Sequence, residues 1–429
     1  MPRKPFEWPA DGSGAILQQH SVAKLEVLRE YLLAYFKTLA TAPGQEEIRV
    51  TLVDGFAGGG VYRHADTQER ILGSPLVFLK AAEQAQAIIN AERRKPLHFN
   101  ITYIFVEKNR NAIKSLLTTL KNEGYAHRLG ADVHVINSTF EQQLDAIISA
   151  VKERTPRRGR ALISLDQYGY KDVPAPLIKR LLQELPRAEI VLTFAVDAFI
   201  NFASDNLATR ETLNHLGIPD VLKGRTFQEI KANESHFRLY IQSCLYHGLT
   251  EACGAGYYTL FFIRTDGHGD YWLVHLSQHP KARDVMTQVH WTKNTHFIHY
   301  GGAGLDMFRA IGYDAGSDER FTGQSSLAFG FDDPANERSI ALLTEQLVRL
   351  VHARETVRFG EMYSTTCNST PADSQRYRKA LENLVDRKEI TITSPKGGQR
   401  RKATTINDDD IIQMAVQRTF SLSSIETYD

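Results

Sequence analysis

A carboxylate and a run of glycines lie together at residues 54–60, where an apolar segment gives way to a loop. Residues 49–54 have the composition of a buried strand, which would place Asp54 at the carboxyl end of that strand. Glycine has no β-carbon, so this loop can turn sharply and approach a ligand closely. Such a loop is how a mononucleotide-binding strand–loop–helix unit begins. The ligand-contacting residues predicted here are Asp54, Gly55, Phe56, Ala57, Gly58 and Gly60.

The spacing of the glycines narrows the class of ligand. Gly55, Gly58, Gly59 and Gly60 match neither the G-x-G-x-x-G of dinucleotide enzymes nor the G-K-[ST] ending of a P-loop. The segment therefore argues against a pyrophosphate cradle and favours a smaller adenosine ligand. The alternative is a tight turn from strand to helix that binds nothing.

Polar residues also end the later apolar segments, and ligands of a doubly wound sheet bind outside the carboxyl ends of its strands. Glu107 ends the second segment, and its carboxylate could accept hydrogen bonds from both ribose hydroxyls. Ser138 and Thr139 follow the third segment and could reach an adenine amine. For Glu107 the alternative is a helix cap, a role that Asn109 could fill equally well.

Residues 166–170 (DQYGY) follow the fourth segment and are the main candidates for catalysis. Enzymes that methylate exocyclic base amines hold the amine with a polar group at this edge and stack an aromatic side chain on the extruded base. Asp166 fits the first role, and Tyr168 and Tyr170 fit the second. Methyl transfer from a sulfonium is an in-line displacement, so positioning and electrostatics can supply most of the acceleration. The alternative is that Asp166 caps the next helix and the tyrosines pack.

The elements that would position these residues alternate between strand and helix. Strands are predicted at 49–56, 101–108, 133–138, 160–169 and 189–197, and helices at 74–94, 111–124, 140–154 and 175–185. Such alternation implies a parallel sheet with helices on both faces. A helix over 16–40 should cover this domain, and residues 199–250 read as a helical insertion. Residues 256–265 and 270–277 then predict a hairpin.

Five parallel strands and a terminal hairpin are the strand inventory of a Rossmann-like methyltransferase fold. The predicted fold class is therefore α/β, with a parallel sheet ending in an antiparallel hairpin and a C-terminal winged-helix domain. We expect an N-terminal arm and helix at 1–45, a methyltransferase-like domain at 46–330, a winged helix at 335–410 and a tail at 411–429.

The winged-helix prediction follows from helical patterns at 336–354, 357–366 and 370–390 and a hairpin at 390–407. Two basic clusters lie where such a domain meets the major groove and the flanking phosphates. The third helix is expected to expose Gln375, Arg376, Arg378 and Lys379, and the wing carries Lys396, Arg400, Arg401 and Lys402. DNA or RNA is therefore an expected partner. The alternative is a winged helix that binds protein.

Composition excludes several classes of protein. No apolar run among the 429 residues approaches the roughly 20 needed to span a bilayer, and no signal-peptide core is present. Cys244, Cys253 and Cys367 are too few and too scattered for a disulfide framework or a zinc site. A cytoplasmic protein without membrane contact is expected. The formal net charge of +1 gives no global argument for nucleic-acid binding.

Three histidines near residues 290–299 could be taken for a zinc site. No carboxylate or cysteine at ligand spacing accompanies His290, His296 and His299, so a structural or substrate-facing role is expected and no metal is predicted.

Five separated blocks of sequence resemble a known family. They are HSVAKLEVLREYL, VDGFAGGGVY, GSPL, DQYGYKDVP and YWLVHLSQHPKARDVM, spread over most of residues 15–310. Together they resemble the bacterial three-Cys-motif partner proteins. Members are often encoded beside a protein with a radical-S-adenosylmethionine-like three-cysteine motif, so the resemblance implies that neighbour as a partner.

More distantly, the chain is similar to ribosomal-RNA adenine methyltransferases that carry D-P-P-Y. That similarity rests on the glycine loop, the fourth-strand acid and the pair His20 and Lys24. It implies S-adenosylmethionine as cofactor, with His20 and Lys24 among the residues that bind it. Two positions depart from the three-Cys-motif partner pattern, since Gln167 and Gly59 stand where prolines are usual.

Three hypotheses follow from these patterns. The first is an S-adenosylmethionine-dependent methyltransferase that acts on nucleic acid delivered by the winged helix. The second is a non-catalytic nucleic-acid-binding partner built on the same fold. The third is a metal-dependent nuclease with Asp54, Glu107 and Asp166 as its acidic cluster.

Overall fold

The chain forms two separate units in the computed structural model. It describes residue 8 and residues 14–17, 19–156, 159–167, 169–233, 237–263, 271–293, 297–299, 302–305 and 329–416. The first unit comprises residues 1–302 and 307–332, and the second comprises residues 303–306 and 333–429. Among the described residues, no helix is long and apolar enough to span a membrane.

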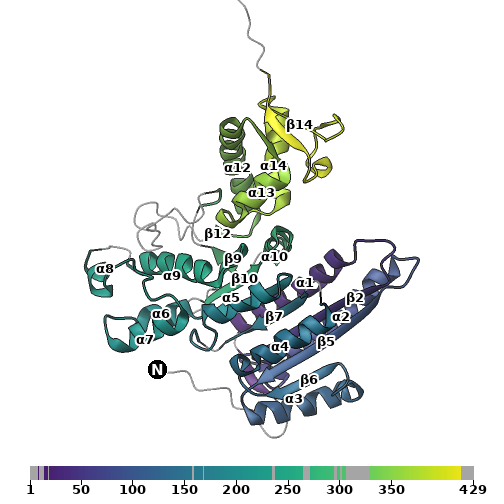
Figure 1. The fold of residues 1–429 in the computed structure, drawn as a ribbon, viewed down its shortest axis with the longest axis vertical. Helices are drawn as coiled ribbons and strands as arrows, with labels where there is room; N and C mark the ends of the chain where they lie inside the picture. Colours follow the sequence, from purple (N-terminus) through teal and green to yellow (C-terminus); the bar gives the residue numbers. More distant parts are fainter. Residues whose placement is uncertain are drawn as a thin grey trace, which may run out of the picture. The chain divides into compact units, whose positions relative to one another are not determined.

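A nine-stranded sheet runs through the described part of the first unit, in the order β12-β11-β9-β10-β8-β7-β2-β5-β6 (Figure 1). Strands β2, β5, β6, β7 and β8 are parallel, and β10 pairs antiparallel with both β8 and β9. This is the Rossmann-like methyltransferase sheet that the sequence predicts, closed by its antiparallel hairpin. The strands are β2 (Glu47–Asp54), β5 (His98–Glu107), β6 (Val133–Asn137), β7 (Ala161–Leu165), β8 (Ala188–Phe194), β9 (Tyr257–Ile263), β10 (Tyr271–Ser277), β11 (Phe297–His299) and β12 (Phe329–Gly330).

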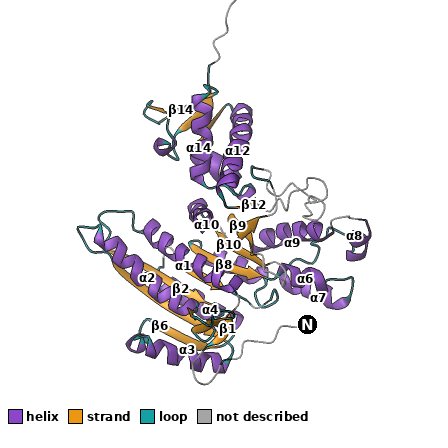
Figure 2. Cartoon of the chain, turned by 180° about the vertical axis from the view of Figure 1, so that it is seen from behind, coloured by secondary structure: helices purple, strands orange, loops and turns teal. Residues whose placement is uncertain are grey.

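Helices cover both faces of this sheet (Figures 1 and 2). On one face α2 packs against α1 and the Phe78 ring lies near Phe105, while α4 and α5 lie over the opposite face. The alternation of Phe105 with Ile104 and Val106 along β5 supplies apolar side chains to both faces, as a parallel sheet requires. The helices are α1 (Gln19–Leu39), α2 (Ser74–Ala91), α3 (Arg110–Asn122), α4 (Phe140–Arg154), α5 (Ala175–Glu184) and α10 (Pro280–Lys293).

A small second sheet lies beside the glycine loop and was not predicted. Its order is β1 (Ala15–Leu17), β3 (Val61–His64) and β4 (Arg70–Leu72). The predicted helix at 16–40 therefore starts too early, since α1 begins at Gln19. Ala15 and Leu17 are buried beside Tyr62 while Ile16 is exposed, which is the alternation of a strand.

Helices occupy the chain between β8 and β9. They are α6 (Val196–Phe202), α7 (Leu207–Leu216), α8 (Phe227–Asn233) and α9 (Phe237–Cys253). Asn206 caps α7 by accepting a 2.8 Å bond from the Thr209 N–H, and Gly217 ends the helix in the left-handed conformation. This insertion places α6 and α7 near the segment that follows β7.

The second unit is a winged-helix domain. Its helices α12 (Asp333–Arg354), α13 (Phe359–Thr366) and α14 (Ser374–Asp386) accompany a sheet ordered β13-β16-β14-β15. Asp373 caps α14, as predicted, by accepting a 3.0 Å bond from the Arg376 N–H. Strands β13 (Thr356–Arg358) and β16 (Ile411–Met414) were not predicted, whereas β14 (Ile390–Thr393) and β15 (Gln399–Arg400) form the expected wing.

Candidate cofactor and acceptor site

The glycine loop is fixed from both sides by the neighbouring strands. The Gly55 N–H donates to the Ser164 carbonyl at 2.9 Å, and the Ala57 N–H donates to the Val106 carbonyl at 3.0 Å. Gly58 has φ +60°, a conformation that favours glycine. A β-carbon on Gly55 would lie only 2.7 Å from Leu165, so side chains are excluded there as well.

Asp54 is completely buried at the base of this loop. Its Oδ1 accepts a 3.1 Å bond from the Phe56 N–H, and the Ser74 side chain also hydrogen-bonds the carboxyl. Its Oδ2 is buried with no hydrogen-bond partner among the described residues. Burial raises the pKa of Asp54 to about 7, and the nearby Asp166 and Glu107 charges act in the same direction. The carboxyl thus retains one unused acceptor beside the loop.

Glu107 connects the end of β5 to the glycine loop. Its Oε2 accepts a 3.0 Å bond from the Gly58 N–H, and its Oε1 accepts a 2.7 Å bond from the Asn109 N–H. The cap of α3 is Asn109, whose Oδ1 accepts from Asn111 and Ala112. Glu107 is therefore not needed to cap α3.

A hollow of about 140 Å³ opens beside the loop, at the carboxyl ends of three strands. Gly55 and Phe56 come from the end of β2, Glu107 from β5, and Ser138 and Thr139 from the end of β6. Sequence reasoning selected these five residues. Other lining residues were missed, namely Lys108, Phe140, Glu141, Lys171, Asp172 and His215.

The sequence could have predicted some of these missed residues but not others. Lys171 and Asp172 directly follow the DQYGY segment and belong to the block DQYGYKDVP, so proximity in sequence could have found them. His215 comes from α7 of the insertion, where its Nε2 lies 2.8 Å from the Lys171 carbonyl oxygen. No local pattern marks His215, since only the fold brings it to the hollow.

An ion pair joins α1 to the end of β7. The Lys24 Nζ lies 2.5 Å from Oδ1 and 2.8 Å from Oδ2 of Asp166. Only 12% of the Lys24 side chain is exposed, against 42% for Asp166. Helix α1 therefore brings Lys24 to Asp166, and the role of Lys24 in cofactor binding stays a prediction. The side chain of His20 lies outside the described residues.

The turn after Asp166 is stabilised by Gln167. Its buried side chain accepts a 3.2 Å bond from the Val173 N–H, which closes the segment 167–173 without the usual proline. Tyr170 is half-buried, with its ring centroid 5.3 Å from Phe199 in an edge-to-face arrangement. Burial raises the pKa of Tyr170. Tyr168 lies outside the described residues.

No three His, Cys, Asp or Glu side chains are grouped to hold a metal ion in the part of the chain that the structure describes. Asp54, Glu107 and Asp166 each have the partners given above, so the nuclease hypothesis gains no support. His290 lies among aromatic rings, with centroids 4.1 Å from Phe261, and burial lowers its pKa to about 3. His296 and the side chain of His299 lie outside the described residues.

The basic residues of the winged helix fall into two groups. Lys379, Lys396, Arg401 and Lys402 are exposed, as is the uncharged Gln375. Three arginines instead bond within the domain. The expectation that the third helix exposes Arg376 and Arg378 is wrong, because only 15% and 22% of their side chains are exposed. Arg376 lies 3.0 Å from Asp373.

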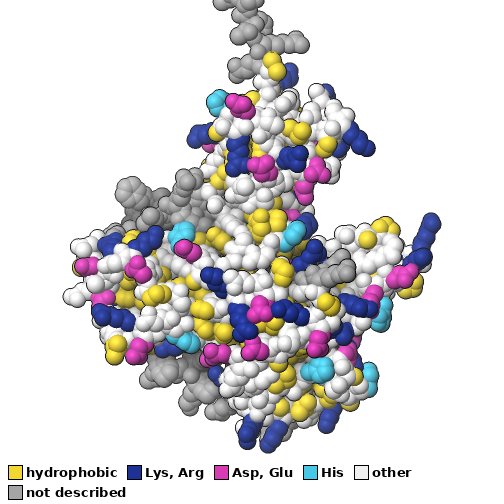
Figure 3. All heavy atoms as spheres, in the orientation of Figure 1, with side chains coloured by type: hydrophobic (Ala, Val, Ile, Leu, Met, Phe, Trp, Pro, Cys, Tyr) yellow, Lys and Arg dark blue, Asp and Glu magenta, His cyan; other side chains and the backbone are white. Residues whose placement is uncertain are grey.

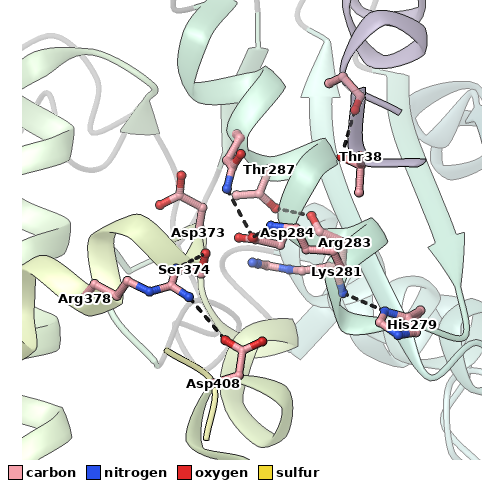
Figure 4. Close-up of polar contacts among 12 residues, drawn as sticks. Thr38, His279, Lys281, Arg283, Asp284, Thr287, Asp373, Ser374, Arg378 and Asp408 are labelled. Atoms are coloured by element: carbon pink, nitrogen blue, oxygen red, sulfur yellow. Dashed lines mark hydrogen bonds and ion pairs between the residues drawn. The ribbon is translucent and has the colours of Figure 1, made fainter. Parts of the chain in front are cut away.

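The other two arginines bind acids of the segment before β16. Arg378 donates to Ser374 at 2.8 Å and to Asp408 at 3.2 Å (Figure 4), and Arg400 donates to the buried Asp410 at 3.1 Å. Residues 333–416 contain 13 Lys and Arg against 12 Asp and Glu. Figure 3 shows both signs interspersed on the face that it presents. Exposed cations lie in the wing at Lys396, Arg401 and Lys402, and others lie outside it, such as Arg387 and Lys388. Lys379 is exposed but lies 2.7 Å from Glu382.

One family model matches the chain. It describes a GMT-like wHTH domain and covers residues 312–397, which include α12, α13, α14 and β14. This agrees with the winged-helix fold of the second unit. No curated protein matches the chain in sequence.

The chain has low similarity to solved structures. A Legionella pneumophila protein of family DUF519 is 11% identical, with 64% of this chain and 92% of that chain covered and a TM-score of 0.35. A human methyltransferase 10 domain containing protein is 11% identical, with 59% and 82% covered and a TM-score of 0.27. M. capricolum TrmK, solved with S-adenosyl-homocysteine, is 8% identical, with 57% and 68% covered and a TM-score of 0.23. These matches are too distant to identify an activity.

Proposed function

We propose that the chain is an S-adenosylmethionine-dependent methyltransferase that acts on nucleic acid, with the winged helix binding the substrate. The observation that carries this proposal is the pairing of the glycine loop with Glu107 beside the hollow at the ends of β2, β5 and β6. Adenosine ligands of open α/β sheets bind at this edge, where a carboxylate at the end of the second strand can hold a ribose.

The residues present fit such a cofactor. Glu107 would hold the ribose hydroxyls, while Ser138 and Thr139 would face the adenine. The unused Oδ2 of Asp54 is a buried acceptor for a cationic amine, which explains why a carboxyl is retained where burial disfavours its charge. The left-handed glycines keep side chains from filling the approach to the loop.

S-adenosylmethionine supplies a methyl group activated by a sulfonium. The task of the protein is then to position an acceptor amine at the end of β7. Lys24 takes one lone pair from each oxygen of Asp166, so both oxygens can still accept from an amine. Tyr168 and Tyr170 are the aromatic residues proposed to stack on the base.

Calorimetric titration of the full chain with S-adenosylmethionine tests this function. We expect binding by the wild type and a large loss in Asp54→Ala and Glu107→Ala. Asp145→Ala is the matched control, because Asp145 is an exposed carboxylate on α4 whose partner is Arg180. No binding by the wild type, or equal affinities in all variants, would rule the proposal out.

A second candidate is a non-catalytic nucleic-acid-binding partner of a three-Cys-motif protein. The winged-helix domain favours it, because such a domain can bind nucleic acid whether or not the first unit transfers a methyl group. This candidate predicts nucleic-acid binding that is lost in Arg401→Ala with Lys402→Ala, and no methyl transfer to any nucleic acid. Co-purification with the neighbouring three-Cys-motif protein would support that partnership.

A further inference from the structure

A second hollow lies next to the candidate reaction edge. It measures about 100 Å³, and its wall includes Tyr170, Lys171, Phe199 and Phe202. Lys171 lines the cofactor-side hollow as well, so the two hollows share a wall. The Ala195 N–H donates to the Gly169 carbonyl at 3.2 Å, which ties the start of α6 to the segment that carries Asp166. The second hollow is therefore placed where an acceptor would enter.

The rim of this hollow exposes large apolar side chains. Phe202 lines the hollow at the end of α6 and is 68% exposed. Leu207 lies in sequence between the lining residues Asn206 and Ala208 and is 71% exposed. Leaving such side chains in water forgoes the stabilisation that their burial would give. Two of them together beside a lined hollow indicate a surface that a ligand covers.

The inner wall is aromatic and carries a cation. Tyr170 lies edge-to-face against Phe199, and the Lys171 Nζ lies 5.8 Å from the centroid of the Tyr170 ring. A flat ring that stacks here would meet aromatic side chains, and its attached phosphate would meet an ammonium group. That combination of stacking platform and positive charge is the chemistry by which proteins hold unpaired nucleotides.

Polar side chains of the wall already bond to backbone groups and to Ser204. Asn206 accepts from the Thr209 N–H and donates to the Ser204 hydroxyl at 2.8 Å, and Thr212 donates to the Ala208 carbonyl at 2.8 Å. These side chains shape the wall, but the atoms named here are already hydrogen-bonded within the protein. Recognition in this hollow would therefore depend on stacking more than on base-edge hydrogen bonds, which tolerates different bases.

We propose that the hollow between α6 and α7 binds an unpaired nucleobase of the substrate, with Phe202 stacking on it. The inference rests on the proposed function and deepens it, since it makes single-stranded or locally opened nucleic acid the substrate class. It also assigns a purpose to the helical insertion, which supplies Phe199 and Phe202 to this hollow and His215 to the other.

Binding of a single-stranded oligonucleotide with one 2-aminopurine tests the proposal. With the full chain we expect 2-aminopurine fluorescence to change on binding, and Phe202→Ala to lose this change and about 5- to 150-fold in affinity. Phe202→Trp should retain both. Ile88→Ala is the matched control, because Ile88 is 51% exposed on α2, outside both hollows. Circular dichroism melting should be unchanged in Phe202→Ala, since little of the side chain is buried.

Equal fluorescence and affinity in Phe202→Ala and Ile88→Ala would overturn the proposal. So would the absence of a base signal with every oligonucleotide, which would point to a protein ligand for this surface. Titration with S-adenosylmethionine separates this result from the proposed function. Phe202→Ala should bind S-adenosylmethionine as the wild type does. A wild type that shows the base signal without binding S-adenosylmethionine would refute the methyltransferase but keep the base site.

Discussion

The Gly58 N–H donates a 3.0 Å hydrogen bond to the Glu107 carboxylate, across 49 residues of sequence. One oxygen of the acid at the end of β5 therefore orients the loop that follows β2, while the other accepts from Asn109. Each carboxylate oxygen has a further lone pair for a ligand. A single side chain thus sets the shape of the loop and presents acceptors beside it.

Glu107→Ala should weaken S-adenosylmethionine binding by about 10- to 150-fold, because hydrogen bonds to a charged group contribute about 1.5–3 kcal/mol. Glu107→Gln should fall between the wild type and Glu107→Ala, since the amide oxygen can still accept from Gly58. Calorimetry on the full chain measures all three affinities. A Gln variant as weak as the Ala variant would show that charge, and not acceptance from the loop, is what matters.

The pH dependence of stability should carry the signature of Asp54. Burial raises the pKa of Asp54 to about 7, against about 3.9 for an unfolded aspartate. Between these values the folded state holds a proton that the unfolded state has released, so stability falls as pH rises from about 4 to about 7. Asp54 alone accounts for a loss on the order of 4 kcal/mol over this window.

Urea unfolding at several pH values checks this assignment. Asp54→Asn cannot release the proton, so its stability should fall less between pH 4 and pH 7 than that of the wild type. Asp145→Asn, at an exposed carboxyl, should follow the wild type. Parallel curves for all three proteins would contradict the raised pKa of Asp54.

Gly59 should be required for the packing of Trp8 on the glycine loop. A β-carbon on Gly59 would lie 2.3 Å from an atom of the Trp8 ring, closer than packed carbon atoms approach. Gly59→Ala should therefore displace the indole, whose centroid lies 5.1 Å from that of Tyr62. Acrylamide quenching of the Trp8 emission, isolated by comparison with Trp8→Phe, should increase. Gly44→Ala is the control, since nothing lies within 4 Å of its added carbon.

This contact accounts for one departure from the resembled family. A proline at position 59 would place ring atoms where the indole lies, so glycine and Trp8 belong together. Gln167 is a comparable case, because its bond from the Val173 N–H closes the turn that a proline would stiffen. The roles of Gly59 and Gln167 could not be seen in the sequence. Trp8, which packs on Gly59, is distant along the chain, and the partner of Gln167 is a backbone N–H.

Much of the first unit could be predicted because its strands and helices are long. Alternating apolar segments of five to ten residues predicted the five parallel strands and the hairpin. Strand β4 has three residues, too few for a periodic signal, so the small sheet was missed. The pair of Lys24 and Asp166 spans 142 residues and carries no local pattern. Only the resemblance directed attention to Lys24.

Residue type also failed to separate binding arginines from structural ones in the winged helix. Arg376, Arg378 and Arg401 look alike in a basic sequence, yet the first two bond within the domain. Asp373 lies three residues before Arg376, whereas Asp408 lies 30 residues after Arg378. An acid close to a basic cluster in the sequence could have indicated a structural arginine, because such an acid competes with phosphate for the guanidinium group.

Arg400 and Arg401 are adjacent in the wing and should respond differently to substitution. Arg400 donates to Asp410, which is 1% exposed. Arg400→Ala would leave that buried carboxylate with only the bond from the Asn407 N–H, which costs about 2 kcal/mol. Arg401 is exposed, so Arg401→Ala should change stability by less than about 0.5 kcal/mol.

Binding should show the reverse order when folded protein is compared. Arg401→Ala should weaken nucleic-acid binding and reduce the salt dependence of the affinity by about one phosphate contact, because an exposed cation displaces counterions when it meets a phosphate. Arg400→Ala should keep the wild-type salt dependence at temperatures below its melting transition. Thermal melting and fluorescence anisotropy across a salt series measure the two effects. If both variants had the same melting temperature and lost binding equally, the assignment of Arg400 to stability and of Arg401 to binding would be wrong.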